Sequence, residues 1–203
     1  MFDLKMNALI FMHANDFEPR ENLLDWKVLL MSRVVELIQE SQTGFVPIFS
    51  PFTDQNPRML VPQLSKMMDV QAEELPQYFV LHPITDQVVP YPHPLDDPAK
   101  FTPELVLLWG RRTVLYLDIE HFEQELSTLE KKKTDDADNF SKEDEQRIAQ
   151  LKEILPAAEE EKKVVIEKHA EIEAALAEKN TWLESVNELI AKVEEEKVKR
   201  EEE

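Results

Sequence analysis

The chain contains no cysteine among its 203 residues. This absence excludes disulfide bonds, catalysis by a thiolate and zinc sites built on cysteine. It also favours an intracellular, reducing compartment, because disulfides form and persist mainly in oxidising ones. The cytosol, the cilium and the mitochondrion all meet that condition, the last with a leader absent or removed.

Glycine is nearly absent too, with only Gly44 and Gly110 in the chain. Two glycines 66 positions apart cannot form a glycine-rich phosphate-binding loop. No calcium loop of the helix-loop-helix type occurs either. The acidic residues 135–138 could contact divalent cations weakly, but this composition is more typical of a soluble linker. We therefore predict no cofactor and no metal site.

Basic residues are fewer than acidic ones. The chain has 23 Lys and Arg and 42 Asp and Glu, which gives a formal net charge of −19. A field of this sign repels phosphate backbones, so nucleic-acid binding is disfavoured. The longest basic run, residues 131–133, is separated only by Thr134 from the acidic stretch 135–138. Long apolar runs are missing as well. Residues 7–12 are too short for a signal-sequence core or a membrane span, and we predict no span.

Proline is unevenly distributed, because 11 of the 13 prolines lie within residues 47–103. Near residues 131–141 the composition changes to a charge-rich, proline-poor part. The predicted organisation is an α/β domain over residues 1–130, an acidic linker over 131–140, a short helix over 141–155 and a long coiled-coil helix over 156–203.

Strand-like and helix-like patterns alternate in the N-terminal part. Residues 8–12 are continuously apolar, which suits a central strand buried on both faces. Residues 23–42 repeat apolar side chains every three or four positions, which predicts a helix with Gly44 as its left-handed cap. The next strand, residues 45–49, contains Pro47, and this predicts an edge or irregular position in the sheet.

The alternation continues toward the middle of the chain. Residues 58–70 keep helical spacing. Residues 78–81 and 87–89 predict a hairpin, with Pro83 and Asp86 marking its turn.

Thr102 followed by Pro103 predicts the start of another helix, with Thr as cap and Pro in the first turn. The resulting order is strand, helix, strand, helix, strand, strand, helix. This order, with Pro76 just ahead of the third strand, resembles the thioredoxin fold, in which a cis-proline begins the strand beside the active site. The resemblance covers about residues 6–130 and rests on element order.

The sequence departs from that family where its chemistry resides. Thioredoxin-like redox enzymes carry Cys-x-x-Cys between the first strand and its helix, and here residues 13–17 read His-Ala-Asn-Asp-Phe. Without a thiol there is no disulfide exchange. The resemblance therefore implies a redox-inactive, non-enzymatic member that serves as a binding or structural module. Its vestigial site would comprise His13, Asp16 and Pro76.

His13 is the most suggestive of the histidines. It follows an apolar strand, at the end where α/β sheets place their ligands, and Asp16 and Glu18 lie nearby. A histidine beside acids can act as a base or metal ligand. No nucleophile accompanies it at a recognisable spacing, so a hydrated or capping role is the more common interpretation.

Two other groups of titratable residues occur. His82, His93 and residues 96–97, both Asp, could supply a mixed metal site, but their spacing matches no defined motif. Asp118 and His121 lie three positions apart on one predicted helix and so share a face. The favoured interpretation of this pair is an exposed ion pair.

The C-terminal part opens with Ser141 and Asp144, a variant of the capping box that predicts a helix start. Pro156 predicts a break or kink, behind which a second helix begins. Seam positions then alternate spacings of three and four for about five heptads, which is typical of a left-handed coiled coil. The seam consists of Leu155, Ala158, Lys162, Val165, His169, Ile172, Leu176, Lys179, Leu183, Val186, Ile190 and Val193.

Three seam positions are polar, namely Lys162, His169 and Lys179. A buried cation is costly unless it is paired, so each must reach water or meet an acid from the partner. Four apolar residues lie outside the seam, namely Val164, Ile166, Trp182 and Leu189. They indicate a third contacting surface, with Trp182 as its first candidate anchor.

We therefore predict that this helix binds a protein partner. The predicted partner-binding residues are Val165, His169, Ile172, Leu176, Trp182, Leu183, Val186, Ile190 and Val193. The favoured function is a non-enzymatic structural or scaffold subunit of a multisubunit complex, docked through the helix, with a hetero-complex favoured over a homodimer.

Two alternatives stay open. The first is a homodimeric adaptor that presents the proline-rich residues 88–94 to an aromatic groove of a partner. Packed on its own domain, the same segment is only a stiff loop. The second alternative is a degenerate thioredoxin-like ligand-binding protein that uses His13 and the loop around Pro76.

Overall fold

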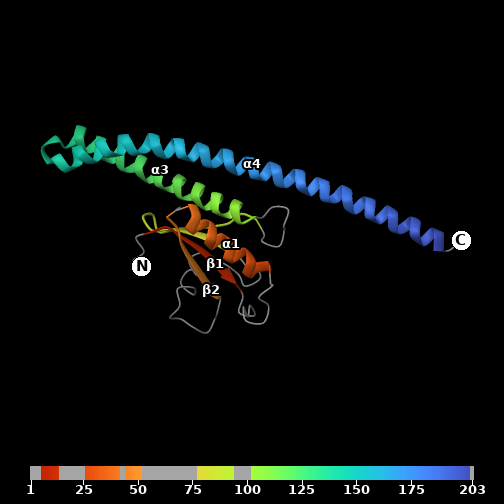
Figure 1. Cartoon of the computed structure of the whole chain (residues 1–203). Helices are drawn as coiled ribbons and strands as arrows, with labels where there is room; N and C mark the ends of the chain where they lie inside the picture. Colours follow the sequence, from red (N-terminus) through yellow and green to blue (C-terminus); the bar gives the residue numbers. More distant parts are fainter. Residues whose placement is uncertain (1–5, 14–25, 42–43, 52–76, 94–101, 202–203) are drawn as a thin grey trace.

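The computed structural model describes residues 6–13, 26–41, 44–51, 77–93 and 102–201. It is an α/β structure in which a small sheet lies beside a long helical hairpin (Figure 1). The predicted helix at residues 58–70 lies outside the described residues. In chain order the elements are β1 Ala8–His13, α1 Trp26–Ser41, β2 Val46–Pro51, β3 Gln77–His82, β4 Gln87–Pro90, α3 Pro103–Asp135, the 3-10 helix η2 Ala137–Asn139 and α4 Lys142–Glu201.

The four described strands form one mixed sheet in the order β2-β1-β3-β4. β1 runs parallel to β2 and antiparallel to β3, and β4 runs antiparallel to β3. β1 is therefore central, and its residues 8–12 are at most 2% exposed, so both faces are buried as predicted. β2 lies at the edge, which confirms the position predicted from Pro47.

Two residues before or within turns have the left-handed backbone conformation that the sequence predicts there. Asp86, in the turn between β3 and β4, has a φ of 53°, and Gly44, just before β2, has a φ of 72°. Both values lie in the left-handed region, which glycine and short polar residues adopt most readily. The predicted hairpin and the predicted left-handed glycine are both confirmed.

α1 and α3 pack against each other and bury the same part of the core. The Thr102 hydroxyl accepts a hydrogen bond from the backbone N–H of Leu105 at 3.2 Å, so the predicted helix start is confirmed. A Cβ atom on Gly110 would lie 3.3 Å from the Phe45 ring, so glycine allows α3 to approach closely. The core comprises Leu9, Phe11, Val34, Ile38, Phe45, Tyr78, Val80, Tyr91, Val106, Leu107, Trp109 and Val114.

The segment predicted as an acidic linker, residues 131–140, is instead a helix end followed by a tight turn. Residues 131–135 are the last turn of α3, and η2 follows directly. The Asp136 N–H donates to the Lys132 carbonyl at 3.0 Å, and the Asn139 amide donates to the Asp136 carboxylate at 2.8 Å. Acidic composition indicated only solvent exposure, and the local hydrogen bonds make this segment a tight turn between two helices.

The predicted separation into a helix at 141–155 and another from 156 is also wrong. α4 is one helix of 60 residues with Pro156 inside it. Proline removes one backbone hydrogen bond and crowds the preceding turn. Here its ring lies at an exposed position, while Leu151 and Val165 on either side are buried. Packing on both sides of the proline therefore holds the helix together.

The start of α4 has the predicted cap in reciprocal form. The Asp144 N–H donates to the Ser141 hydroxyl at 3.1 Å, and the Ser141 N–H donates to the Asp144 carboxylate at 2.9 Å. Each side chain therefore satisfies a backbone donor of the first turn, as in a capping box.

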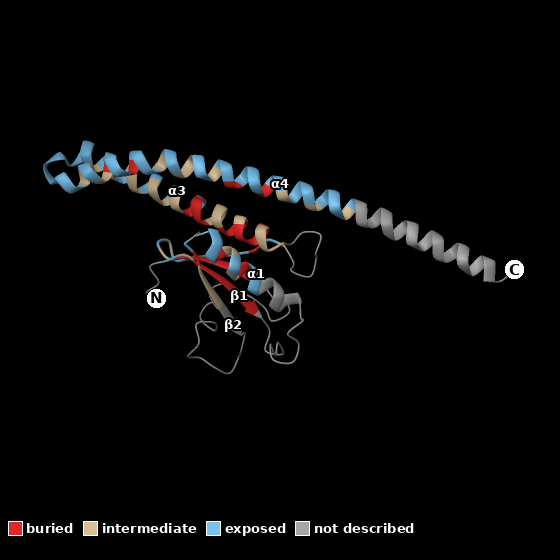
Figure 2. Cartoon of the chain, in the orientation of Figure 1, coloured by how far each residue is buried: buried red, intermediate tan, exposed pale blue. Residues whose placement is uncertain are grey.

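α3 and α4 form an antiparallel hairpin with charges paired across it. The guanidinium of Arg147 donates two hydrogen bonds of 2.8 Å to the Glu125 carboxylate, which is a bidentate arrangement. Four further ion pairs cross the hairpin among the described residues, namely Lys132–Asp144, Lys133–Glu145, Lys152–Glu130 and Arg111–Glu161. Up to Thr181, where burial is described, the outer face of α4 is exposed and the buried residues recur along the face toward α3 (Figure 2).

No helix among the described residues is both long and apolar enough to cross a bilayer.

Candidate functional site

The first half of the predicted seam is used inside the chain. Val165 and His169 are 7% and 8% exposed, on the face of α4 that packs on α3. Their assignment as residues that bind an external partner is therefore corrected. A heptad pattern specifies that a helix packs against another helix, but it does not say which chain supplies the second one.

The second half of the seam extends past α3. Glu104, in the first turn of α3, lines the same cavity as Ile172, so α3 begins beside that residue. α4 then continues to Glu201, over 29 residues that span on the order of 40 Å. We call residues 173–201 the distal arm, and Figure 1 shows it projecting beyond the rest of the described chain. Its backbone is helical, and Leu176 is half-buried. The side chains of Trp182, Leu183, Val186, Ile190 and Val193 lie outside the described part.

The polar seam residue Lys162 finds its partners within the chain. Its ammonium lies 2.7 Å from the Glu159 carboxylate and 5.2 Å from the centre of the Tyr116 ring on α3. The sequence required an acid or water for this cation, and α4 supplies the acid one turn earlier. The aromatic face of Tyr116 adds an attractive contact.

His169 lies on the buried face of α4, at a junction with Arg112 of α3 and with His93, which follows β4. Its Nδ1 lies 3.2 Å from the Glu173 carboxylate. Burial, which disfavours the charged ring, is the main reason that the pKa of His169 is lowered, and the nearby charges of Arg112 and His93 add to this effect. Glu173 opposes it. The ring is therefore held in its neutral form more strongly than an exposed histidine.

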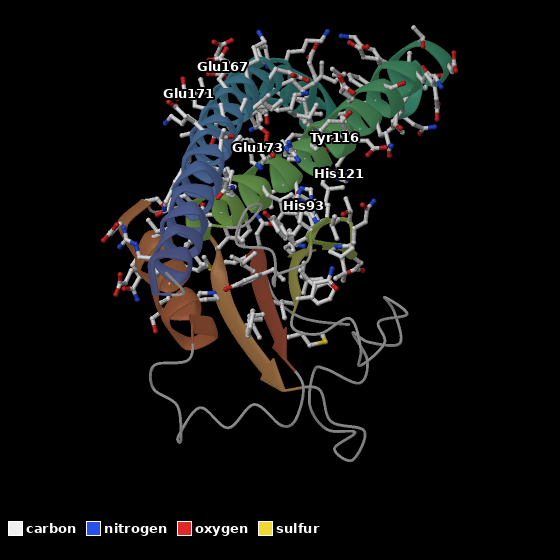
Figure 3. All side chains as sticks on the ribbon, turned by 90° about the vertical axis from the view of Figure 1, so that its right-hand side faces the viewer. His93, Tyr116, His121, Glu167, Glu171 and Glu173 are labelled. Carbon is white, nitrogen blue, oxygen red and sulfur yellow. The ribbon has the colours of Figure 1, made fainter. Side chains whose placement is uncertain are left out.

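The same junction contains a buried tyrosine. Tyr91 packs edge-on against Trp109, with 5.1 Å between ring centres, and against His93 at 5.6 Å. Burial raises its pKa to about 12, assisted by the negative charge of Glu173 and opposed by Arg112. Tyr91, His93, Arg112, His169 and Glu173 thus come from three separate parts of the chain. We call these five residues the β4-side cluster, and Figure 3 shows Glu173 and His93 on the same side of α4.

The β4-side cluster is suited to fixing α4 on the α/β unit. It mixes one guanidinium, one carboxylate and aromatic or imidazole rings, so charge is balanced locally. Among the described residues, no group of three or more His, Cys, Asp or Glu side chains could hold a metal ion. Residues 96–97, which the sequence could have grouped with His82 and His93, lie outside the described part.

His82 has a role that sequence reasoning missed. The ring is fully buried, its Nε2 lies 3.0 Å from Asp118 on α3, and its Nδ1 lies 2.8 Å from the Thr85 hydroxyl. In a neutral ring, Nε2–H donates to the carboxylate and Nδ1 accepts from the hydroxyl. Asp118 therefore pairs with a residue 36 positions away, whereas the prediction paired it with His121.

An Asp–His–hydroxyl chain can serve nucleophilic catalysis when a substrate reaches the hydroxyl and the ring. His82 has no exposed surface, so a substrate cannot reach its ring directly. We interpret the Asp118–His82–Thr85 chain as a connection between α3 and the β3–β4 turn. No local pattern could indicate it, because the partners come from separate elements.

A cavity of about 270 Å³ lies on the other side of α4, between α1, α3 and α4. Its apolar walls come from one residue of α1, two of α3 and one of α4, namely Leu37, Leu107, Leu108 and Ile172. Its charged lining residues are Glu104, Lys168 and Glu171. We call it the α1-side cavity. Figure 3 shows Glu171 on the side of α4 away from His93.

The predicted vestigial site can be placed only through the backbone. Met12 of β1 pairs with Gln77 of β3, so the end of β1 at His13 lies beside the start of β3. The His13 side chain, Asp16 and Pro76 lie outside the described residues. Their role in ligand binding stays a prediction.

Comparison with known proteins gives no further assignment. No protein family, no curated protein and no solved structure matches the chain.

Proposed function

We propose that this chain is a non-enzymatic structural subunit of a larger multisubunit assembly, and that it docks into the assembly through the distal arm of α4. The supporting observation is that α4 continues for about 40 Å past the start of α3. The seam of the sequence continues along that length through Leu183, Val186 and Ile190. An apolar stripe on a helix needs a packing partner, and beyond Ile172 α3 cannot supply one.

The charge of the chain favours a basic partner of different sequence. Residues 173–203 contain ten acidic and five basic side chains, and the whole chain carries a formal charge of −19. Pairing two copies would bring these like charges together, which opposes association. A partner helix with Lys or Arg beside its apolar seam would gain from the same charges. A coiled coil between the distal arm and such a helix is the geometry we propose.

The thioredoxin-like assignment of the α/β unit belongs to the same proposal. It is supported by the order of the described elements β1, α1, β2, β3, β4 and α3, which is the order that the resemblance implies except for the helix predicted at residues 58–70, outside the described part. The full sequence has no cysteine, so a unit of this kind cannot perform disulfide exchange. Its proposed role is to present a surface, and α4 places that surface within the assembly.

The oligomeric state of the purified full chain is the first test. We expect a monomer by size-exclusion chromatography with light scattering at micromolar concentration. A stable homodimer would contradict the hetero-complex and favour a self-associating adaptor.

The second test asks whether the seam of the distal arm carries the assembly. In native extract, the tagged chain should co-fractionate with a large complex. The double variant Leu183→Asp with Ile190→Asp should be lost from that complex. Thr181→Asp with Ser185→Asp adds the same charge opposite the seam, and should stay in it. Equal behaviour of the two double variants would remove the support for docking through the seam.

A further inference from the structure

The size of the α1-side cavity limits what it can hold. Its volume of about 270 Å³ is below the roughly 300–1,000 Å³ of pockets that take drug-sized ligands. A cavity of this size suits one large side chain better than a cofactor. Its walls are formed by Leu37, Leu107, Leu108 and Ile172, so the group inside it would be apolar.

The charges around the cavity are mainly negative. Glu104 comes from the first turn of α3 and Glu171 from α4, and Lys168 is the one basic residue among the charged side chains that line this cavity. A cationic group on the occupant could lie beside either carboxylate while its apolar part fills the cavity. The occupant predicted by this chemistry is an apolar side chain with Lys or Arg close by.

A stripe of α4 leads from the cavity onto the distal arm. Val164, which is 42% exposed, lies one turn before Lys168 and so on the same side of the helix. Spacings of three and four extend this stripe through Glu171 to Ala175, Glu178 and Trp182. This line lies beside the main seam, where the sequence indicated a third contacting surface. A partner helix lying along it would pass over the cavity.

We propose that the α1-side cavity is the anchor pocket for one bulky apolar side chain of the partner helix, flanked in that helix by Lys or Arg. This inference rests on the proposed function, because the same partner runs along the distal arm. Helix-in-groove recognition works in this way, with a few apolar anchors entering pockets. Anchors in well-packed, desolvated pockets commonly dominate the affinity of such interfaces.

The test uses the full chain and a synthetic peptide as the probe. The peptide is a 21-residue alanine-rich helix carrying one Trp with Lys four positions before and after it. We expect saturable binding, with methyl NMR shifts centred on Leu37, Leu108 and Ile172. Replacing the Trp by Ala, or the two Lys by Glu, should weaken binding at least about tenfold.

Matched variants of the chain locate the site. Leu108→Trp fills the cavity and Glu171→Lys reverses its charge, and each should weaken peptide binding at least about tenfold. Ile166→Trp is the control for Leu108→Trp, because it adds a Trp on the other side of α4. Glu153→Lys is the control for Glu171→Lys, because it makes the same charge change about 27 Å away along α4, toward the hairpin turn. Both controls should bind as the unchanged chain does. Circular dichroism checks that every variant is folded.

The outcome is separable from that of the proposed function. The double variant Leu183→Asp with Ile190→Asp should still bind the peptide, because the cavity is intact. Peptide binding that survives Leu108→Trp, or a peptide that binds equally well without its Trp, would overturn the anchor pocket and leave the seam untouched. Failure of the seam variants to leave the complex would instead overturn the proposed function alone.

Discussion

At the scale of single residues, the buried imidazole of His82 ties α3 to the β3–β4 turn through Asp118 and Thr85. Both ring nitrogens are satisfied, which is the usual condition for a polar group with no exposed surface. The ring would lose one partner if Asp118 were truncated. A buried donor left without an acceptor is destabilising by roughly 1–3 kcal/mol.

Asp118→Ala should therefore lower the free energy of unfolding by about 1–3 kcal/mol. Urea denaturation followed by circular dichroism measures it. Glu120→Ala, at an exposed position two residues further along α3, should change stability by less than about 0.5 kcal/mol. A loss no larger for Asp118→Ala than for Glu120→Ala would argue against the buried connection.

His169 gives the stability a dependence on pH. Its pKa is lowered in the folded chain, mainly by burial, so the unfolded chain takes up the proton more readily. The stabilising contribution is complete above the unfolded pKa of about 6.5 and is lost as the pH falls below it. The groups around the ring are Glu173 on α4, Arg112 on α3 and His93 after β4.

His169→Leu should remove part of the stability loss that the unchanged chain undergoes between about pH 7 and pH 5. The comparison is between urea midpoints at the two pH values. His121→Leu replaces a half-exposed histidine of α3, and should retain the loss. If both variants keep the full loss, His169 is not its source.

At the scale of elements, α4 tolerates a proline that its sequence alone identified as a break. Pro156 has no backbone N–H, so α4 lacks one backbone hydrogen bond at this point. Because Pro156 is exposed, no core contact depends on its ring. The helix is retained because tertiary contacts with α3 outweigh this local defect. Removing the defect should therefore be favourable.

Pro156→Ala should raise the free energy of unfolding by about 2 kcal/mol, since proline is roughly 3 kcal/mol less favourable than alanine inside a helix and stiffens the unfolded chain slightly. Urea denaturation measures the change. Glu153→Ala, also exposed on α4, serves as the comparison and should shift stability by less than about 0.5 kcal/mol. No gain for Pro156→Ala would mean that the proline is built into the packing of the hairpin.

At the scale of the whole molecule, α4 has two parts. The first packs against α3, and the second extends beyond the rest of the described chain. Residues up to Ile172 pack on α3 and close the core, with buried seam residues and ion pairs across the hairpin. Within the distal arm Glu173 belongs to the β4-side cluster, and the residues after it run past the start of α3. The stability of these later residues as an isolated helix depends on local terms alone, which are marginal in water.

Removing residues 177–203 should therefore leave the free energy of unfolding of the remaining chain within about 0.5 kcal/mol of its full-length value. Removing residues 161–203 should lower it by several kcal/mol, because the buried Val165 and His169 are lost with their contacts. Hydrogen exchange gives an independent measurement, with slow amides before Ile172 and fast amides in the distal arm. Slow exchange throughout α4 in a monomer would contradict this division.

The sequence by itself determined the features that depend on neighbouring residues. The buried central strand, the edge position of Pro47, the Thr102 cap and the Ser141–Asp144 capping box all follow from local sequence, and the structure has each of them. These signals act within a few residues, so no knowledge of the fold is needed. The heptad seam likewise indicated correctly that α4 packs against a helix.

Only the tertiary structure decided which groups meet across the chain. It assigns Val165 and His169 to α3 of the same chain, makes the acidic segment a tight turn and carries α4 through Pro156. It also joins His82 to Asp118 and forms the α1-side cavity from three helices. These outcomes depend on packing between distant segments, because a periodic pattern fixes which face of a helix is buried and leaves the partner of that face open.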